Sequence, residues 1–130
     1  MGWPYSGVFK KKSGSKLGNK KTERAGYSFG SKLEAAVFDQ LKLMEAAGEI
    51  KIVRTQASVY MTPAKILYKP DFECLDLRTD KTFYVEAKGF ETPVWRIKYR
   101  LWPHFVEADL HIYKGTHSKP YLDEVLKGKS

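Results

Sequence analysis

The chain has 130 residues, a length that fits one domain, and 42% of them are hydrophobic, enough for a single core without a disulfide or metal staple. Its one cysteine, Cys74, excludes an internal disulfide and a cysteine-rich zinc cage. The sequence has no run of about 18 apolar residues and no initial stretch typical of a signal peptide, so we expect a soluble cytoplasmic protein.

Most of the net charge of +8 lies at the start of the chain, where residues 1–24 hold seven basic residues against one acidic residue. Because glycine and serine punctuate this segment, we expect a flexible basic arm over residues 1–24. Such an arm favours a polyanion such as nucleic acid or an anionic membrane, although a solubilising tail has the same composition. The residues of the arm that we assign to DNA contacts are Lys10, Lys11, Lys12, Lys16, Lys20, Lys21 and Arg24.

Residues 31–47 are predicted to form the first helix. Ser31 is a suitable N-cap, and Glu34 stands three residues later, in the capping-box position. Apolar residues then recur at helical spacing up to Gly48, a residue type that commonly ends a helix. Residues 50–60 alternate imperfectly between apolar and polar side chains, which predicts a strand.

A β-hairpin is predicted over residues 66–88, with a polar turn at 78–81. After it, Thr92 and Pro93 have the residue types of an N-cap and a first helical position. This second helix is expected to end ahead of Pro103, because proline removes a helical hydrogen bond.

A last strand is predicted at 106–113, and residues 115–130 are expected to be a tail or a short helix over 118–127. The order helix, strand, hairpin, helix, strand predicts an α/β domain over residues 25–114, built around a mixed sheet.

Glu86 and Lys88 stand two residues apart on the predicted return strand, so both side chains leave the same face, roughly 6.6 Å apart along it. The position of Asp71 depends on the hairpin register. A turn centred after residue 79 places Asp71 opposite Lys88, with Glu86 as its diagonal neighbour on the same surface. A slip of one residue would send Asp71 to the other face.

These three side chains have the composition of a metal-dependent phosphodiesterase site. Two close carboxylates repel each other, and a divalent cation reverses that preference. Mg²⁺ favours one or two carboxylates together with waters and phosphate oxygens, and we expect Mn²⁺ to substitute for it. Lys88 could hold a phosphate oxygen or orient the attacking water. Singly, such residues are usually solvated, but the apolar strand around Glu86 and Lys88 favours a functional role.

The segments 68–72 and 83–90, which contain Pro70-Asp71 and Glu86-Ala87-Lys88, resemble the two motifs of the PD-(D/E)XK nuclease superfamily. A wider pattern over residues 18–114 resembles the phage endonuclease-I-like families of Holliday-junction resolvases. That pattern comprises Ser31-Lys32-x-Glu34-Ala35, Gln56, and Gly89-Phe90-x-Thr92 leading to Lys98.

The resemblance implies an αβββαβ, restriction-endonuclease-like core with a central mixed sheet flanked by helices. It implies that Asp71 and Glu86 bind the metal, that Lys88 positions or activates water, and that Glu34 completes the metal shell directly or through water. It also implies a homodimer that presents two active sites to a four-way junction. Gln56 could line the site, although a local hydrogen bond is an alternative role.

The helix at 93–102 has three arcs when its residues are placed at about 100° intervals. We assign the aliphatic arc to the core: Val94, Ile97 and Leu101. An aromatic arc is typical of core, then of a dimer interface, then of base stacking: Trp95, Tyr99 and Trp102. Basic residues are interpreted either as phosphate contacts or as a solvated face: Arg96, Lys98 and Arg100.

The sequence thus predicts a Mg²⁺-dependent, structure-selective DNA endonuclease, a phage Holliday-junction resolvase, acting in the host cytoplasm. One alternative is a PD-(D/E)XK nuclease acting on duplex, flap or single-stranded DNA. Others are a non-catalytic DNA-binding protein on a decayed nuclease scaffold and a basic structural or ribosome-associated protein. No GxxxxGK[ST] loop is present, so no nucleotide cofactor is expected, and no membrane is expected as a partner.

Overall fold

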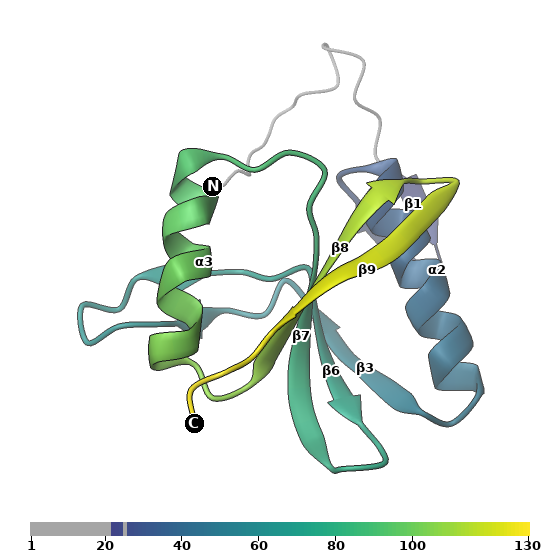
Figure 1. Cartoon of the computed structure of the whole chain (residues 1–130). Helices are drawn as coiled ribbons and strands as arrows, with labels where there is room; N and C mark the ends of the chain where they lie inside the picture. Colours follow the sequence, from purple (N-terminus) through teal and green to yellow (C-terminus); the bar gives the residue numbers. More distant parts are fainter. Residues whose placement is uncertain (1–21, 25) are drawn as a thin grey trace.

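The computed structural model describes residues 22–24 and 26–130 (Figure 1). The elements run in chain order as β1 (Thr22–Arg24), β2 (Tyr27–Phe29), α2 (Lys32–Ala46), β3 (Ile50–Thr55), β4 (Val59–Tyr60), β5 (Leu67–Tyr68), β6 (Phe72–Asp76), β7 (Lys81–Ala87), α3 (Pro93–Phe105), β8 (Asp109–Thr116) and β9 (Lys119–Leu126). None of the described helices is long and apolar enough to cross a membrane.

A five-stranded sheet in the order β3-β6-β7-β8-β9 forms the centre of the fold. Only the β7–β8 pair is parallel among the strands that the structure describes, and the other pairs in this sheet are antiparallel. The sheet is therefore mixed, and the expected α/β class is confirmed. The strand pairs β1–β2 and β4–β5 stand apart as two small ribbons.

The two helices cover opposite faces of this sheet (Figure 1). On one face, α2 packs its apolar side against Phe72, Cys74 and Val85 of the central hairpin. On the other face, α3 packs against Leu110 and Ile112 of β8. The site described below lies where the β6–β7 hairpin meets both layers.

Local sequence accounts for α2, whose predicted bounds of 31–47 are confirmed by the observed helix with its two caps. The Ser31 hydroxyl accepts a hydrogen bond of 3.0 Å from the backbone N–H of Glu34. After Ala47, Gly48 has a left-handed φ of +79°, a conformation that costs glycine little.

The single strand predicted over 50–60 is wrong, because the chain turns at Gln56. This residue has a left-handed φ of +54°, which ends β3 at Thr55. The chain then leaves the central sheet, and β4 pairs only with β5.

The short helix predicted over 118–127 is also wrong, because this segment forms β9 and pairs antiparallel with β8. The turn between the two strands is held by the Thr116 hydroxyl, which accepts from the Lys119 N–H at 3.2 Å. A hairpin therefore replaces the predicted helix, and the domain extends past its predicted end at residue 114.

Helix α3 also passes its predicted end and includes Pro103, reaching Phe105. The proline lies in the last turn, so the hydrogen bond that it cannot donate is lost only near the end of the helix. The backbone N–H of Val106 still donates to the Trp102 carbonyl at 3.0 Å. The last strand accordingly begins at Asp109, later than predicted.

The predicted arm is described only at its end, where residues 22–24 are strand β1. Its assigned DNA contacts at Lys10 to Lys21 lie outside the described residues.

Candidate active site

The register of the β6–β7 hairpin places Asp71 and Glu86 side by side. Phe72 pairs with Val85, and continuing this register by one residue sets Asp71 directly opposite Glu86. The predicted register, with Asp71 opposite Lys88, is therefore wrong by two residues, because the turn is centred after residue 78. An even shift leaves every side chain on its face, so the predicted grouping survives. Both carboxylates are buried, with exposures of 8% and 6%.

Asp71 is held by hydrogen bonds on both carboxylate oxygens. Its Oδ2 accepts from the backbone N–H of Ala87 at 2.8 Å, and its Oδ1 accepts from the side-chain amide of Gln56 at 3.2 Å. The backbone N–H of Gln56 also donates to the Asp71 carbonyl at 3.0 Å. Gln56 therefore lines the site, and its hydrogen bonds reach a residue 15 positions away, so the alternative of a local hydrogen bond is wrong. Its turned backbone brings its amide to Asp71.

Glu86 is oriented by a chain of two buried donors. The Trp95 indole N–H donates to the Tyr68 hydroxyl at 3.0 Å, and that hydroxyl donates to Glu86 Oε1 at 2.9 Å. Because an indole nitrogen can only donate, the hydroxyl must direct its own hydrogen to Glu86. We call Tyr68 and Trp95 the aromatic brace. It fixes Oε1 and leaves Oε2 facing the neighbouring lysine.

Lys88 is held between Glu86 and the aromatic brace. Its Nζ lies 3.3 Å from Glu86 Oε2 and 5.2 Å from the centre of the Trp95 ring. The ion pair and the ring face both restrain the position of the ammonium. Trp95 therefore supports both residues of the Glu86-x-Lys88 motif, one through Tyr68 and the other through its ring.

Glu34 enters the same electrostatic environment from the first turn of α2. Burial raises the pKa of Glu34 to about 8, the negative charge of Glu86 adds to this rise, and the Gly30 backbone and Lys88 oppose it. Burial also raises the pKa of Asp71 well above its ordinary value, with further increases from the charges of Glu34 and Glu86. The structure thus brings all three predicted carboxylates within electrostatic reach of one another.

The pKa of Glu86 is also raised by burial, although Lys88 and the hydrogen bond from Tyr68 act in the opposite direction. The cluster therefore carries more acidic groups than one lysine can neutralise. The raised pKa values mean that these acidic groups hold protons more readily than exposed carboxylates do.

The three cations expected on α3 fall into different environments. Lys98 is half-buried and near the site: burial lowers its pKa, Glu86 opposes that change, and Lys88 adds to it. Arg96 is paired with Glu91 at 3.2 Å and lies over the Tyr99 ring at 4.8 Å. Arg100 is exposed. Lys98 is thus the member of this set that the structure places beside the carboxylates.

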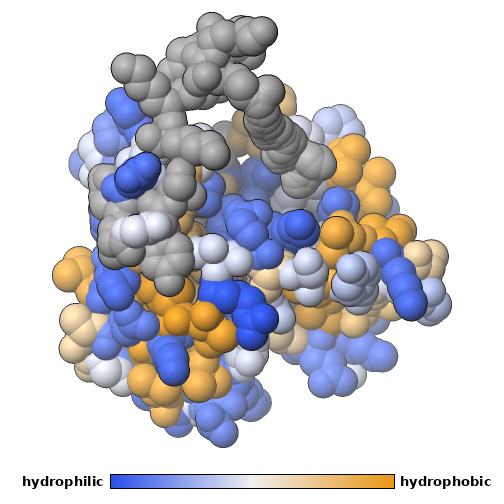
Figure 2. Space-filling view, turned by 180° about the vertical axis from the view of Figure 1, so that it is seen from behind, coloured by the Kyte–Doolittle hydropathy of each residue, from blue (hydrophilic) through white to orange (hydrophobic). Residues whose placement is uncertain are grey.

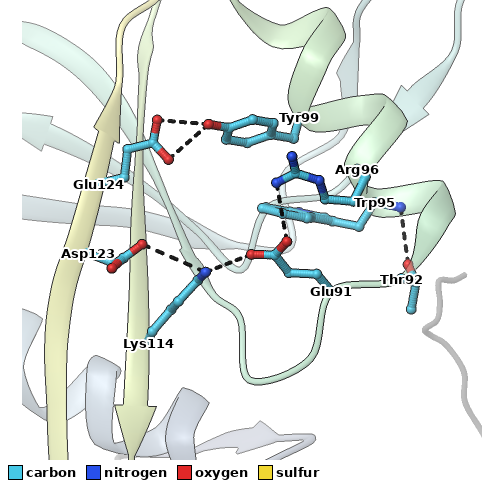
Figure 3. A network of polar contacts seen from close by, with 8 residues as sticks. All are labelled: Glu91, Thr92, Trp95, Arg96, Tyr99, Lys114, Asp123 and Glu124. Atoms are coloured by element: carbon cyan, nitrogen blue, oxygen red, sulfur yellow. Dashed lines mark hydrogen bonds and ion pairs between the residues drawn. The ribbon is translucent and has the colours of Figure 1, made fainter.

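A polar network joins the loop after Lys88 to the far strands of the sheet (Figure 3). Glu91 accepts from Lys114 of β8 at 2.6 Å and from Arg96 of α3 at 3.2 Å. Tyr99 donates to the Glu124 carboxylate of β9. These contacts fasten both the loop and α3 to the β8–β9 hairpin, whose strand β9 was not predicted.

The core assignment of α3 requires a correction. Val94 and Ile97, predicted to be core, are 55% and 58% exposed, whereas Trp95 and Trp102 are buried. The tryptophans are buried in preference to these aliphatic residues because their indole N–H groups have hydrogen-bond acceptors inside the protein. Trp102 donates its indole N–H to the Ala108 carbonyl at 2.8 Å, in addition to the Trp95 contact described above.

Sequence reasoning missed the aromatic brace and Phe90. Tyr68 and Trp95 are 27 residues apart, and no spacing rule relates a strand tyrosine to a helix tryptophan at that separation. Phe90 was noted only as part of a motif, yet it is 79% exposed on the loop between β7 and α3. The signal that could have identified it is an aromatic residue directly after a glycine at a strand end.

The donor set fits a hard divalent cation such as Mg²⁺. Within residues 22–24 and 26–130, no three histidine, cysteine or acidic side chains already form a metal-binding group. Mg²⁺, however, requires only one or two carboxylates besides water and phosphate oxygens, and Asp71 and Glu86 supply these. The raised pKa values of the carboxylates show that added positive charge would be favourable here.

Comparison with known proteins gives one family assignment. Neither the curated proteins nor the solved structures compared with this chain gave a match. The sequence model of a family described as "Protein of unknown function (DUF1064)" matches residues 14–119, a range that includes every carboxylate of the candidate site. The chain therefore belongs to the DUF1064 family.

Proposed function

We propose that this protein is a metal-dependent DNA endonuclease with a PD-(D/E)XK core, acting on four-way junctions as a Holliday-junction resolvase. The observation that carries the proposal is the grouping of the buried Asp71 and Glu86 carboxylates with the partly buried Lys88 ammonium, where β6 begins and β7 ends. Burying two carboxylates and an ammonium costs folding free energy, so a site of this kind calls for a function. The elements α2, β3, β6, β7, α3 and β8 follow one another in the order expected of this core, with the separate β4–β5 ribbon inserted between β3 and β6.

Asp71 and Glu86 would hold the metal, with Glu34 as a third carboxylate. When bound, Mg²⁺ supplies positive charge to the phosphate and lowers the pKa of water, which activates it as a nucleophile. The protein's own contribution is orientation. Gln56 and the Ala87 N–H fix both oxygens of Asp71, and the aromatic brace fixes one oxygen of Glu86.

Lys88 would contact the phosphate or orient the attacking water. Its ammonium is paired with Glu86 and lies over the Trp95 ring, so it is positioned to stabilise negative charge that develops on phosphate oxygens. Lys98 adds a second positive charge from α3. Arg100 and the basic residues of the arm would contact flanking phosphates, which gives recognition of shape rather than of base sequence.

Junction cleavage motivates the proposal of a homodimer. Two symmetric cuts across a four-way junction require two active sites, and one chain supplies a single set of these carboxylates. A nuclease for flap, duplex or single-stranded DNA could use the same residues as a monomer. A binding protein that no longer cleaves would have no use for Lys88 between Glu86 and an indole ring.

The test is a cleavage assay with Mg²⁺ on an immobile four-way junction, the matching duplex, a flap and a single strand. The inactive control is Asp71→Asn. A matched control is Asp80→Asn, the same chemical change on an exposed turn, where the left-handed φ of +59° also suits asparagine.

Paired symmetric cuts in the junction, lost in Asp71→Asn and kept in Asp80→Asn, are the expected result. Cutting of another substrate would retain the nuclease and reject the resolvase. Tight binding without cleavage in Mg²⁺ or Mn²⁺ would instead support the non-catalytic scaffold.

A further inference from the structure

An apolar stripe runs from the loop beside the candidate site onto the outer face of α3. Phe90 is 79% exposed, and Val94 and Ile97 follow at spacings of four and three residues with 55% and 58% exposure. This spacing places Val94 and Ile97 on one face of the helix. Figure 2, which views the molecule from behind, shows that apolar side chains also reach the surface elsewhere, among hydrophilic ones.

Basic residues outnumber acidic ones along the chain at this stripe. No acidic residue stands between Thr92 and Val106, whereas this segment contains Arg96, Lys98, Arg100 and His104. The nearby acidic residue Glu91 is already paired with Lys114 and Arg96. The outer surface of α3 therefore combines exposed apolar side chains with cations that have no acidic neighbour on their own helix.

This charge pattern argues against a second copy of the chain as the occupant. A two-fold interface brings a surface against itself, so the exposed Arg100 would approach its own counterpart, and α3 carries no carboxylate to pair with it. An occupant with negative charge and flat apolar surfaces fits better. A nucleic-acid strand has both, because its phosphates are anionic and the faces of its bases stack on aromatic side chains.

We propose that Phe90 and the outer face of α3 form a binding surface for a DNA strand whose bases have left the duplex stack, with Phe90 stacking on one such base next to the cleavage site. The inference rests on the proposed nuclease function and names its substrate class. In intact duplex the base faces are covered by their neighbours. Phe90 therefore gains a partner only at a junction, a flap or a single-stranded region.

The position of Phe90 links the stacked base to the cleavage site. It lies two residues after Lys88, and the loop that carries it is fastened by Glu91 to Lys114 at 2.6 Å. A base held on Phe90 would therefore stand at a fixed place relative to the phosphate that Lys88 contacts. The loop is restrained on both sides of an exposed aromatic ring, which lowers the entropy cost of stacking.

The experiment measures DNA binding separately from cleavage, in the Asp71→Asn background. Fluorescence anisotropy would give the affinity for duplex, flap, single-stranded and four-way DNA, and 2-aminopurine at the branch point would report unstacking. The variants are Phe90→Ala and Phe90→Trp. Leu43→Ala is the matched control, because Leu43 is a 73% exposed aliphatic residue on α2.

We expect Phe90→Ala to weaken binding to branched and single-stranded DNA by about 5- to 150-fold, the range for loss of one base–aromatic stack, without changing duplex affinity. Phe90→Trp should keep the affinity, and Leu43→Ala should leave it unchanged. Loss of affinity that is equal for duplex and branched DNA, or no loss at all, overturns the proposal. So does a dimer in sedimentation that Phe90→Ala dissociates, because the stripe would then be an interface between copies.

The two proposals fail separately. Selective loss in Phe90→Ala, combined with no cleavage of any substrate by the unmodified protein, supports the surface and rejects the nuclease. Cleavage that is unaffected by Phe90→Ala, on every substrate, supports the nuclease and rejects the surface.

Discussion

Helices α2 and α3 cover opposite faces of one sheet, yet they distribute their side chains differently. Helix α2 buries Val37, Phe38 and Leu41 against the hairpin. Helix α3 buries Trp95 and Trp102 and leaves Val94 and Ile97 exposed. These buried side chains of α2 are apolar and act by packing, whereas the buried rings of α3 also donate hydrogen bonds, one of them toward the candidate site.

Burial therefore has two purposes in this protein. Under α2, burial stabilises the fold, and any well-packed apolar residue could serve. Under α3, burial places N–H and O–H donors at defined points next to Glu86 and Lys88. Aromatic residues with polar tips suit that purpose, and the aliphatic residues that they displace become available for binding.

The largest expected effect is on the α2 side. Phe38→Ala removes a ring that stacks between Phe29 and Phe72, with centroid distances of 4.9 and 5.9 Å. We expect the free energy of unfolding to fall by about 3–5 kcal/mol, measured by urea denaturation. Leu43→Ala on the same helix, exposed to solvent, should change it by less than about 0.5 kcal/mol. Similar losses in both variants would show that α2 is not a packing helix.

The next effect tests whether Trp95 acts through Tyr68. Tyr68→Phe and Trp95→Phe should each lower the cleavage rate by about 10- to 100-fold, because each removes one donor from the chain that orients Glu86. The double variant should be no slower than Tyr68→Phe alone. If the two losses in cleavage rate multiplied in the double variant, the two rings would act independently, and the hydrogen-bonded chain from Trp95 through Tyr68 to Glu86 would be contradicted. The Mg²⁺ concentration for half-maximal cleavage should rise in all three variants.

Glu34 gives the pH dependence expected of the metal-free protein. Its folded pKa of about 8 lies above the ordinary value of 4.5, so the folded state binds more protons over this interval. Stability from Glu34 is therefore complete below about pH 4.5 and is lost as the pH rises to about 8. With a chelator present, the melting temperature of Glu34→Gln should rise relative to that of the unmodified protein as the pH is increased. If the difference in melting temperature between the two proteins stayed constant across this pH interval, Glu34 would not be a proton-binding group of the folded state.

The smallest effect is expected on the outer face of α3. Ile97→Ser should change the free energy of unfolding by less than about 0.5 kcal/mol, because the side chain is 58% exposed. Urea denaturation would measure this value beside Phe38→Ala. A fall in the free energy of unfolding by more than about 1 kcal/mol, as expected for a buried side chain, would show that Ile97 belongs to the core. The two helices would then not differ in how they use their aliphatic residues.

The sequence was sufficient for those parts of the site that follow from strand periodicity. Glu86 and Lys88 share a face at any register, and Asp71 joins them whenever the hairpin shifts by an even number of residues. The shift of two residues therefore changed the pairing but not the grouping. Ser31 and Thr92 predicted both helix starts for a similar reason, because capping is a local interaction.

The remaining features depend on contacts between distant segments. The strand identity of 119–126 is decided by pairing with β8, which local propensity does not encode. Helix α3 buries its tryptophans in place of Val94 and Ile97 because the two indole N–H groups find acceptors elsewhere in the fold. These acceptors are the Tyr68 hydroxyl and the Ala108 carbonyl. Hydrophobicity alone favoured Val94 and Ile97 as core, because it ignores the hydrogen-bonding tip of tryptophan.

The parallel pairing of β7 with β8 has a consequence for the order in which the chain folds. The β6–β7 hairpin closes over a short loop, whereas β8 can join only after the chain has crossed over through α3. Because longer loops cost more entropy to close, we expect the hairpin to form first and α3 to dock late. Asp71 and Glu86 would then meet before Trp95 reaches Tyr68, so an early folding species would hold the paired acids without the side chains that orient them.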